Sequence, residues 1–381
     1  MKFAHIADNH LGYSQYGLYP REEDVFEAFK ENIDKIIEER VDFVIHSGDL
    51  FEMAKPSPHV LLVFQEALLK LKNANIDVFA IAGNHDIVMR RNTISPQYLS
   101  KNLGLKLIDS KNPYYIYKDI FIGGITYHSK PYKDDLINSL KNLSKQAENY
   151  ERRILLLHQG IDKFLPWQYE LELDEIPKNF NYYACGHVHN RIMADFGDGK
   201  LAYPGSTEIL KKNEVIDYKK NGKGFYLVDI SGNIPEIEAI DVKPKREFIV
   251  KIIQYPNLDN DISNLKREIK DLDKPPILNL LIEGGNFSKS DVLEVLNNEL
   301  SDLTLTVKTD FDIVSLRKNN IGTELSHLSA NDLLKKYLSE FANEDIDNLA
   351  MNLLDKLSKD KIGDGKRIAA KFYKQYFERD I

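Results

Sequence analysis

Histidines and aspartates recur along the first half of this 381-residue chain in short motifs, each at or just after the end of a predicted strand. The motifs are Asp8-Asn9-His10, Gly48-Asp49-Leu50, Gly83-Asn84-His85-Asp86, His158 and Gly186-His187-Val188-His189. Hard and borderline divalent ions accept carboxylates, amide oxygens and neutral imidazoles as ligands, and they require no thiolate. Together, and in this order, the motifs predict a metal centre.

Spacing within the motifs indicates shared ligation. Side chains two residues apart in extended backbone point to the same side, so Asp8 and His10 can bind one ion together, and His187 and His189 repeat that spacing. Two ions ~3.5–4 Å apart need a ligand that bridges them, and the Asp49 carboxylate suits that role. One such motif alone is a weak signal, whereas the whole series indicates a two-metal site.

The elements that position these motifs alternate along residues 1 to about 235. Helical spacing of apolar residues predicts helices over 21–39 and 59–71. Short apolar runs predict the strands that precede the motifs, at residues 2–7, 41–46, 77–82, 154–157 and 181–184. This order predicts an α/β domain with either one mixed sheet or two sheets, covered by helices.

Residues 1–240 are therefore expected to form one domain, and a second pattern begins near Lys243. Residues 245–313 alternate strand, helix, strand, helix and strand, which predicts a small independent βαβαβ domain. Residues 315–330 are predicted to be a linker. Residues 331–381 are predicted to form amphipathic C-terminal helices that bind a partner.

The last 26 residues, Lys356–Ile381, hold eight Lys or Arg and four Asp or Glu, with aromatic residues at helical spacing. One interpretation is a basic amphipathic helix that docks on a partner or on DNA. The other is a terminal helix whose cations complement its dipole and whose aromatic residues form a local core.

Composition sets further limits. The formal net charge of −8 argues against a surface that is basic overall, but it leaves room for a local basic track. The single Cys185 excludes a disulfide framework and any cysteine-based zinc site, so we expect an intracellular, reducing compartment. The longest apolar runs fall far short of the ~18 residues of a membrane span, and the first residues are typical of a strand rather than of a signal peptide.

The series D-x-H, G-D, G-N-H-D, a lone His and G-H-x-H resembles that of the calcineurin-like metallophosphoesterases. The longer strings FAHIADNHLGY, HSGDLF, GNHD, LLLHQG, YYACGHVH and YPGSTE are similar to archaeal double-strand-break repair nucleases of the meiotic-recombination-eleven/SbcD family. The resemblance covers residues 1 to about 235, while the small domain and the C-terminal helices match in size and order. It implies a two-sheet α-β-β-α sandwich, with residues 245–313 as a small α+β capping domain that binds DNA.

The resemblance also implies roles for single residues. It implies two Mn²⁺ ions per chain, with these ligands: Asp8, His10 and His189 for one ion, Asn84, His158 and His187 for the other, and Asp49 between the two. Mg²⁺ and other divalent ions are also compatible with these donors. The family gives His85 no ligand role, which implies that His85 stabilises or protonates the departing alkoxide during in-line attack of a hydroxide on the phosphodiester.

Glu52 departs from the pattern, because close relatives often carry at this position a His implicated in the exonuclease reaction. In the phosphatase branches, an acidic residue three after the Asp orients the catalytic His instead. We therefore predict that Glu52 pairs with His85 and holds its tautomer. The alternative is an exposed carboxylate in a loop.

Four residues near the motifs are candidates for DNA contact. Tyr13 and Tyr16 follow the first ligand pair in a loop flanked by glycines, and aromatic loop residues can stack on bases. Arg90 and Arg91 come just after the third motif, where a phosphate backbone would leave the metals. The alternatives are surface packing for the tyrosines and a solvated helix face for the arginines.

The implied function is that of a manganese-dependent DNA nuclease, a 3′–5′ exonuclease on duplex DNA and an endonuclease on single strands. It would act on double-strand breaks as a homodimer at the nucleoid, with an SMC-like coiled-coil ABC ATPase held by the C-terminal helices. The alternative is a phosphatase or cyclic-nucleotide phosphodiesterase of the same superfamily, which often shows G-D-x-x-D-R where Gly48–Met53 does not. A third possibility, a non-catalytic scaffold, is disfavoured by the complete ligand set with His85.

Overall fold

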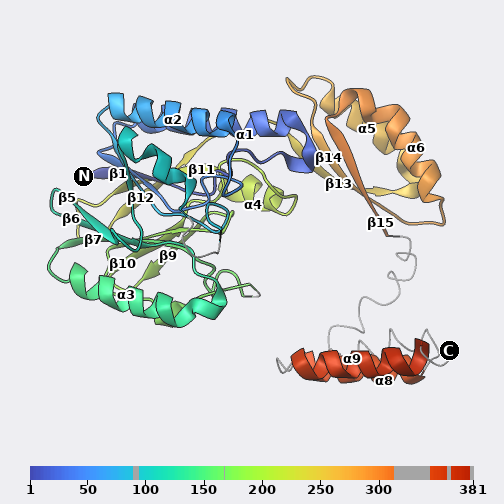
Figure 1. The fold of residues 1–381 in the computed structure, drawn as a ribbon. Helices are drawn as coiled ribbons and strands as arrows, with labels where there is room; N and C mark the ends of the chain where they lie inside the picture. The colour runs from blue at the N-terminus through green and yellow to red at the C-terminus, as the bar shows by residue number, and fades with distance from the viewer. Residues whose placement is uncertain (89–93, 167, 313–343, 358–361, 378–381) are drawn as a thin grey trace. The chain divides into compact units, whose positions relative to one another are not determined.

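The computed structural model describes residues 1–88, 94–166, 168–312, 344–357 and 362–377. Of the sequence-based predictions, Arg90, Arg91, the 315–330 linker and the 331–343 segment lie outside these residues. Two mixed six-stranded sheets dominate the fold (Figure 1). The first has the order β12-β11-β1-β2-β3-β4, with β1 (Lys2–Ile6), β2 (Phe43–His46), β3 (Asp77–Ala80), β4 (Leu105–Leu107), β11 (Gly224–Asp229) and β12 (Glu236–Asp241). The second has the order β5-β6-β7-β8-β10-β9, with β5 (Tyr114–Tyr117), β6 (Ile120–Ile125), β7 (Arg152–His158), β8 (Tyr182–Gly186), β9 (Ile192–Phe196) and β10 (Gly199–Tyr203).

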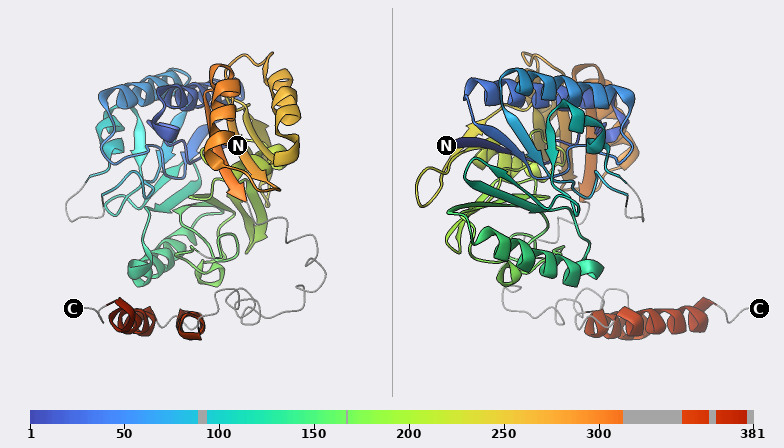
Figure 2. Two further views of the ribbon diagram at one scale, coloured as in Figure 1. Left: turned by 90° about the vertical axis from the view of Figure 1, so that its right-hand side faces the viewer. Right: turned by 60° about the vertical axis from the view of Figure 1, so that its left-hand side comes forward.

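Helices cover the outer face of each sheet. Both views in Figure 2 keep α1 (Tyr19–Glu38) and α2 (Pro58–Asn73) on one outer face, and α3 (Lys133–Ala147) on the opposite one. A shorter helix, α4 (Glu214–Asn221), follows the second sheet. The predicted two-sheet α-β-β-α sandwich is thereby confirmed.

The core forms three layers because most strands bury both of their faces. In β2, Phe43 and Ile45 point into the layer between the sheets, where the Phe3 ring stacks on Phe43 at 5.0 Å between centroids. Val44, between them in sequence, points the other way, into the layer beneath α1 and α2. Burial on two sides explains why these strands are continuous apolar runs rather than alternating ones.

Parallel pairing brings the motif-bearing strand ends together. In the first sheet β1 and β2 pair in parallel with Ile6 opposite His46, and β2 and β3 pair in parallel with His46 opposite Ala80. In the second sheet β7 and β8 pair in parallel with His158 opposite Gly186. Ligands in sheets of this kind bind outside the carboxyl ends of the strands, and every predicted metal motif lies at such an end.

A third, three-stranded sheet has the order β13-β14-β15. Its strands are β13 (Phe248–Gln254), β14 (Ile277–Glu283) and β15 (Thr306–Asp312), joined by the helices α5 (Leu258–Ile269) and α6 (Lys289–Leu300). The order of elements is the predicted βαβαβ. The apolar residues predict that the last strand starts at Leu303, but it starts at Thr306 because Ser301–Leu303 forms a 3₁₀ turn after α6.

The chain folds into two compact units. The first comprises Met1–Lys251, Asn264–Asn279 and Asn297–Lys308 and contains both six-stranded sheets, and the rest of the chain forms the second. Within the second unit, α8 (Glu344–Leu357) packs alongside α9 (Ile362–Phe377). Among the described residues, no helix has the length and apolar composition that crossing a membrane requires.

Candidate metal centre

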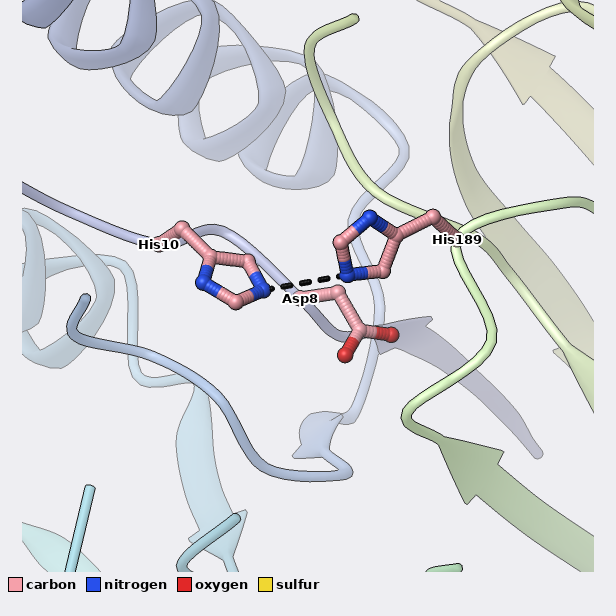
Figure 3. Close-up of side chains that lie close together, drawn as sticks. All are labelled: Asp8, His10 and His189. Atoms are coloured by element: carbon pink, nitrogen blue, oxygen red, sulfur yellow. Dashed lines mark hydrogen bonds between the residues drawn. The ribbon is translucent and has the colours of Figure 1, made fainter. Parts of the chain in front are cut away.

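Ligand atoms from distant parts of the chain converge at the strand ends. One ligand atom each from Asp8, His10 and His189 lies within 4.8 Å of the others, and Figure 3 shows these three side chains close together. Asp49, His158 and His187 form a second group that meets the same criterion. These residues come from loops after β1, β2 and β8 and from the last residue of β7.

The backbone at the ligands is held in an unusual conformation. Four of them adopt positive φ angles that side-chain-bearing residues rarely take: Asp8 (52°), His10 (48°), Asp49 (51°) and His187 (89°). Such conformations cost free energy of order 1–3 kcal/mol each and persist where the surrounding structure enforces them. Their gathering at one point marks a site where the placement of the side chains outweighs the local preference of the backbone.

The first ligand group has the geometry of a cation site. His10 Nδ1 lies 2.8 Å from Oε2 of Glu52, and His189 Nδ1 lies 2.8 Å from Oε1 of Glu214. A carboxylate accepts a hydrogen bond, so each ring carries its hydrogen on Nδ1 and, when neutral, has a lone pair on Nε2. The two Nε2 atoms are only 3.2 Å apart, with Asp8 beside them (Figure 3). Because facing lone pairs repel, a cation that both can coordinate fits this arrangement.

The second ligand group is assembled around an amide oxygen. Asn84 Oδ1 lies 2.9 Å from His187 Nδ1 and 3.2 Å from His158 Nε2. Oδ2 of Asp49 lies 3.2 Å from His158 Nε2 and 3.7 Å from His10 Nε2. Asp49 therefore faces both groups, which is the placement expected of a bridging carboxylate. The donors fit divalent ions that prefer oxygen and imidazole ligands.

The electrostatics of Asp49 and His158 favour positive charge at the centre. Burial alone would raise the pKa of the Asp49 carboxyl, but the neighbouring His158 outweighs burial and holds that pKa well below its usual range. Burial would likewise lower the pKa of His158, but Asp49 raises it to about 9. The buried carboxylate thus requires a cation beside it, and binding of a metal ion displaces the imidazole proton that otherwise supplies the charge.

His85 lines the site but belongs to neither ligand group above. Its backbone N–H donates to Asp49 Oδ1 at 2.9 Å, and its ring Nδ1 lies 2.9 Å from the main-chain oxygen of Glu52. A carbonyl only accepts, so Nδ1 carries a hydrogen and Nε2 is the ring's other functional atom. The His85 side chain is 37% exposed, consistent with access to substrate.

The carboxylate of Glu52 lies between the rings of His10 and His85. The side chain bonds to His10 at 2.8 Å, whereas its closest approach to His85 Nδ1 is 3.6 Å. Nδ1 of His85 thus has the main-chain oxygen of Glu52 as its hydrogen-bond partner and the Glu52 carboxylate at ion-pair distance, and the orienting role of that carboxylate stays a prediction. With 24% exposure, the carboxylate is also not the free loop group of the alternative.

Glycines allow the ligand loops to approach one another. A Cβ on Gly83 would lie 2.2 Å from Asp49 Oδ1, and one on Gly186 would lie 2.2 Å from the main-chain oxygen of Ser47. Gly48 has φ of +95°, and its Cβ would lie 2.4 Å from His158 Nδ1. The glycines before the ligands are thus required for close packing as well as for the turns.

The ligands open into a cavity of about 450 Å³. Tyr13 lines it, whereas Tyr16 is 40% exposed and its ring lies under Lys308 Nζ, 4.6 Å from the centroid. Among the described residues that line the cavity, Lys211 is the one Lys or Arg. The cavity therefore suits an anionic substrate when cations occupy its floor.

Comparison with known proteins identifies the family. The chain is 46% identical over 272 residues to the DNA double-strand break repair protein Mre11 of Methanocaldococcus jannaschii, covering 70% of this chain and 74% of that protein. The Mre11 protein of Methanococcus maripaludis is 39% identical, and the match covers 94% of this chain and 95% of that protein. The Mre11 protein of Saccharolobus solfataricus is 32% identical, and the match covers 95% of this chain and 96% of that protein. A model of the calcineurin-like phosphoesterase family matches residues 1–191. The chain is a calcineurin-like phosphoesterase of the Mre11 family.

The match with Mre11 proteins extends beyond the sandwich, since two of these relatives align along more than nine-tenths of this phosphoesterase. The predicted family is confirmed, and the similarity also includes the segments after residue 235, where the sequence offered only size and order. The ligands of this phosphoesterase are those of a divalent metal centre.

Several residues of the site escaped the sequence analysis. Glu214 supports His189, buried Lys223 lies 2.9 Å from Glu214, and Asp86 accepts the backbone N–H groups of Phe51 and Gly83 at 2.8 and 2.9 Å. Asp86 stands inside the motif G-N-H-D, so that string contained its signal. Glu214 and Lys223 belong to no motif, and only the folded chain brings them to the ligands.

Proposed function

We propose that this phosphoesterase is a manganese-dependent DNA nuclease of double-strand break repair, with 3′–5′ exonuclease activity on duplex DNA and endonuclease activity on single strands. The observation that carries the proposal is a complete set of converging donors, with His85 beside them, in a chain similar to Mre11 repair proteins over most of its length. Phosphodiester hydrolysis is the chemistry that such a site performs.

The site residues divide the work between binding and proton transfer. Two Mn²⁺ ions, when bound, supply positive charge that neutralises phosphate oxygens and lowers the pKa of water. Asp8, Asp49 and the imidazoles hold that charge at the strand ends. His85, fixed at Nδ1 by the Glu52 carbonyl, has Nε2 left to stabilise or protonate the leaving oxygen.

DNA contact is proposed for the aromatic loop after the first ligand pair. Tyr13 lines the cavity, and the ring of Tyr16, in the same loop, is paired with the Lys308 ammonium. A ring and a cation together suit a base and its phosphate. The Arg90 and Arg91 contacts stay predictions.

We further propose that the C-terminal helices bind an SMC-like coiled-coil ABC ATPase and that the enzyme acts as a homodimer on chromosomal DNA in the cytoplasm. Basic residues are concentrated at the end of the chain, in the segment that contains α9, and this charge supports a docking role. Co-purification of the ATPase with the full chain but not with a chain truncated at residue 315 is the expected result. Equal recovery with both chains would contradict it.

Cleavage of two DNA substrates tests the function. The purified chain is incubated in Mn²⁺ with end-labelled duplex DNA and with circular single-stranded DNA, with bis-p-nitrophenyl phosphate as a small diester. We expect shortening of the duplex from its 3′ ends and opening of the circle, both abolished by chelation. Hydrolysis of the small diester without cleavage of either DNA would instead support the phosphatase or cyclic-nucleotide phosphodiesterase alternative.

A further inference from the structure

The imidazole of His189 is held from behind by a buried carboxylate. Its Nδ1 lies 2.8 Å from Oε1 of Glu214, the first residue of α4, and its Nε2 faces His10. Because the carboxylate accepts, the ring hydrogen is on Nδ1 and the lone pair is on Nε2. A carboxylate in this position fixes both the tautomer and the orientation of a metal-binding histidine and makes it a stronger ligand.

Glu214 is itself held at its second oxygen. Oε2 lies 2.9 Å from Lys223 Nζ and accepts from Ser206 Oγ at 3.1 Å and from the backbone N–H of Leu210 at 3.2 Å. The side chain is 3% exposed, so these partners replace water almost completely. With both oxygens bound, the carboxylate has one orientation, and Oε1 faces His189.

Lys223 contacts both the carboxylate and the histidine's backbone. The lysine is 3% exposed, and its ammonium donates to Ser206 Oγ at 2.5 Å and to the main-chain oxygen of His189 at 3.2 Å. A buried ammonium is costly and is tolerated where its charge and donors are all matched. Here they are matched by the carboxylate that supports His189 and by the main chain of His189 itself.

We propose that Glu214 and Lys223 are positioning residues for a single metal ion, the one held by Asp8, His10 and His189. Glu214 sets the tautomer and direction of the His189 ring, and Lys223 keeps Glu214 and the His189 backbone in place. This inference rests on the proposed two-metal function and deepens it.

The other ligand group is supported by different atoms, which makes the proposal selective. His158 Nδ1 donates to the main-chain oxygen of Ser47 at 2.7 Å, and His187 Nδ1 lies against Asn84. Neither Glu214 nor Lys223 has a hydrogen bond or ion pair with these residues among the described contacts. Loss of this support should therefore weaken the binding of one ion and leave the binding of the second unchanged.

The test uses Mn²⁺ alone, without DNA, and the full chain. The variant E214Q/K223M removes both charges together and keeps similar side-chain volumes, so neither buried group is left as an unpaired ion. Titration calorimetry and the count of bound Mn²⁺ should show two ions on the wild type. In the variant, one site should bind about 10–100-fold more weakly, the range seen when such outer partners of metal ligands are mutated.

Two further variants separate positioning from folding. D217N neutralises a second carboxylate of α4, as E214Q does, but at a side chain that accepts from the backbone N–H of Arg191 instead of a ligand ring, and it should leave both Mn²⁺ affinities unchanged. K223M alone keeps the hydrogen bond between Glu214 and His189, so its loss of affinity should be smaller than that of the double variant.

Three outcomes would overturn the inference. Two unweakened sites in E214Q/K223M would show that the pair does not position a ligand. Weakening of both sites with a lowered melting temperature of the metal-free chain would show that the pair supports the fold instead. Fewer than two ions on the wild type would contradict the two-metal function itself, and the inference with it.

Discussion

Single residues at the centre are placed by partners of opposite character. The rings of His10 and His189 bond through Nδ1 to carboxylates, which leaves their two Nε2 atoms directed at one point. His85 bonds to a carbonyl instead, and it clusters with His10 and Glu52 rather than with Asp8 and His189 or with Asp49 and His158. This difference separates binding of the metal from proton transfer.

His85→Gln should separate these two roles. Gln cannot donate a proton to the leaving oxygen, so cleavage of DNA should fall by about 10²–10⁴-fold. The affinity for Mn²⁺, measured by calorimetry, should stay at the wild-type value because the ligands are intact. Wild-type cleavage by His85→Gln would remove His85 from the mechanism.

Glu52→Gln should have a much smaller effect on turnover. The main-chain oxygen that fixes His85 is unchanged by the substitution, and Gln still offers an acceptor oxygen to His10. We expect kcat within about tenfold of wild type at saturating Mn²⁺, together with a raised Mn²⁺ requirement because a neutral acceptor polarises His10 less. A loss of kcat as large as that of His85→Gln would show that the carboxylate acts on His85 after all.

At this scale, the sequence revealed the ligands better than their supports. Ligand types and order are constrained by metal chemistry, so Asp8, His10 and His189 were recognisable from motifs. Glu214 and Lys223 act through contacts across tens of residues, and many acidic or basic residues have the same local pattern. Only tertiary structure distinguishes them.

Among the elements, the strand ends and the glycines after them bring the ligand loops together. The loops after β1, β2 and β3 come from one sheet, and the ligands of β7 and β8 come from the other. Gly48 and Gly186 leave space for His158 and for the Ser47 carbonyl between them. The site is therefore built by two sheets whose strand ends must approach each other closely.

Gly48→Ala should disrupt the centre more than its one added methyl group suggests. The residue has φ of +95°, and the new Cβ would lie 2.4 Å from Nδ1 of His158, so the change strains the backbone by about 1–3 kcal/mol and displaces a ligand. A lowered melting temperature and weaker Mn²⁺ binding are expected. Gly232→Ala, whose Cβ would approach nothing closer than 3.5 Å, is the control. Equal behaviour of the two variants would contradict the close-packing argument.

Element types were predictable from apolar periodicity, because buried strands and amphipathic helices differ in period. Boundaries were less so. The apolar run at the end of the third sheet begins at Leu303, but Ser301–Leu303 forms a 3₁₀ turn and β15 starts only at Thr306. Hydrogen bonding rather than hydropathy decides where a strand starts. The face-to-face packing of the two sheets was inferred from the fold class, whereas the register of the strands within each sheet came only with the structure.

On the scale of the whole molecule, charge is organised locally and the net value of −8 says little about partners. The carboxylates at the centre are placed to hold the cations to which a phosphate would bind. A separate buried network joins α1 to the residues that precede β13 and β14 of the third sheet. There Asp24, fully buried, accepts from Arg21 and Arg246 at 2.7 Å each and from Lys274 at 3.0 Å.

Asp24→Asn should destabilise the fold by about 3–5 kcal/mol, because it leaves buried cations without their carboxylate. Burial would raise the pKa of Asp24, but Arg246, Arg21 and Lys274 outweigh it and hold the pKa below its usual value. A depressed pKa stabilises the fold above the unfolded-state pKa of ~4, and this contribution is lost as the pH falls through the folded-state value.

Urea unfolding at pH 7 and at decreasing pH measures this effect. The difference between wild type and Asp24→Asn should be full at pH 7 and should shrink below pH ~4. Asp34→Asn, which removes an exposed pair with Lys70, should change stability by less than about 0.5 kcal/mol. A loss for Asp24→Asn no greater than for Asp34→Asn would show that the network carries no stability.

The central claim is that strand-end residues of both sheets hold two divalent ions side by side, and anomalous scattering from crystals grown with Mn²⁺ tests it most directly. Two peaks are predicted, about 3.5–4 Å apart. One should be bound by Asp8, His10 and His189 and the other by Asn84, His158 and His187, with Asp49 touching both. A single peak, or two peaks that Asp49 does not bridge, would contradict the account.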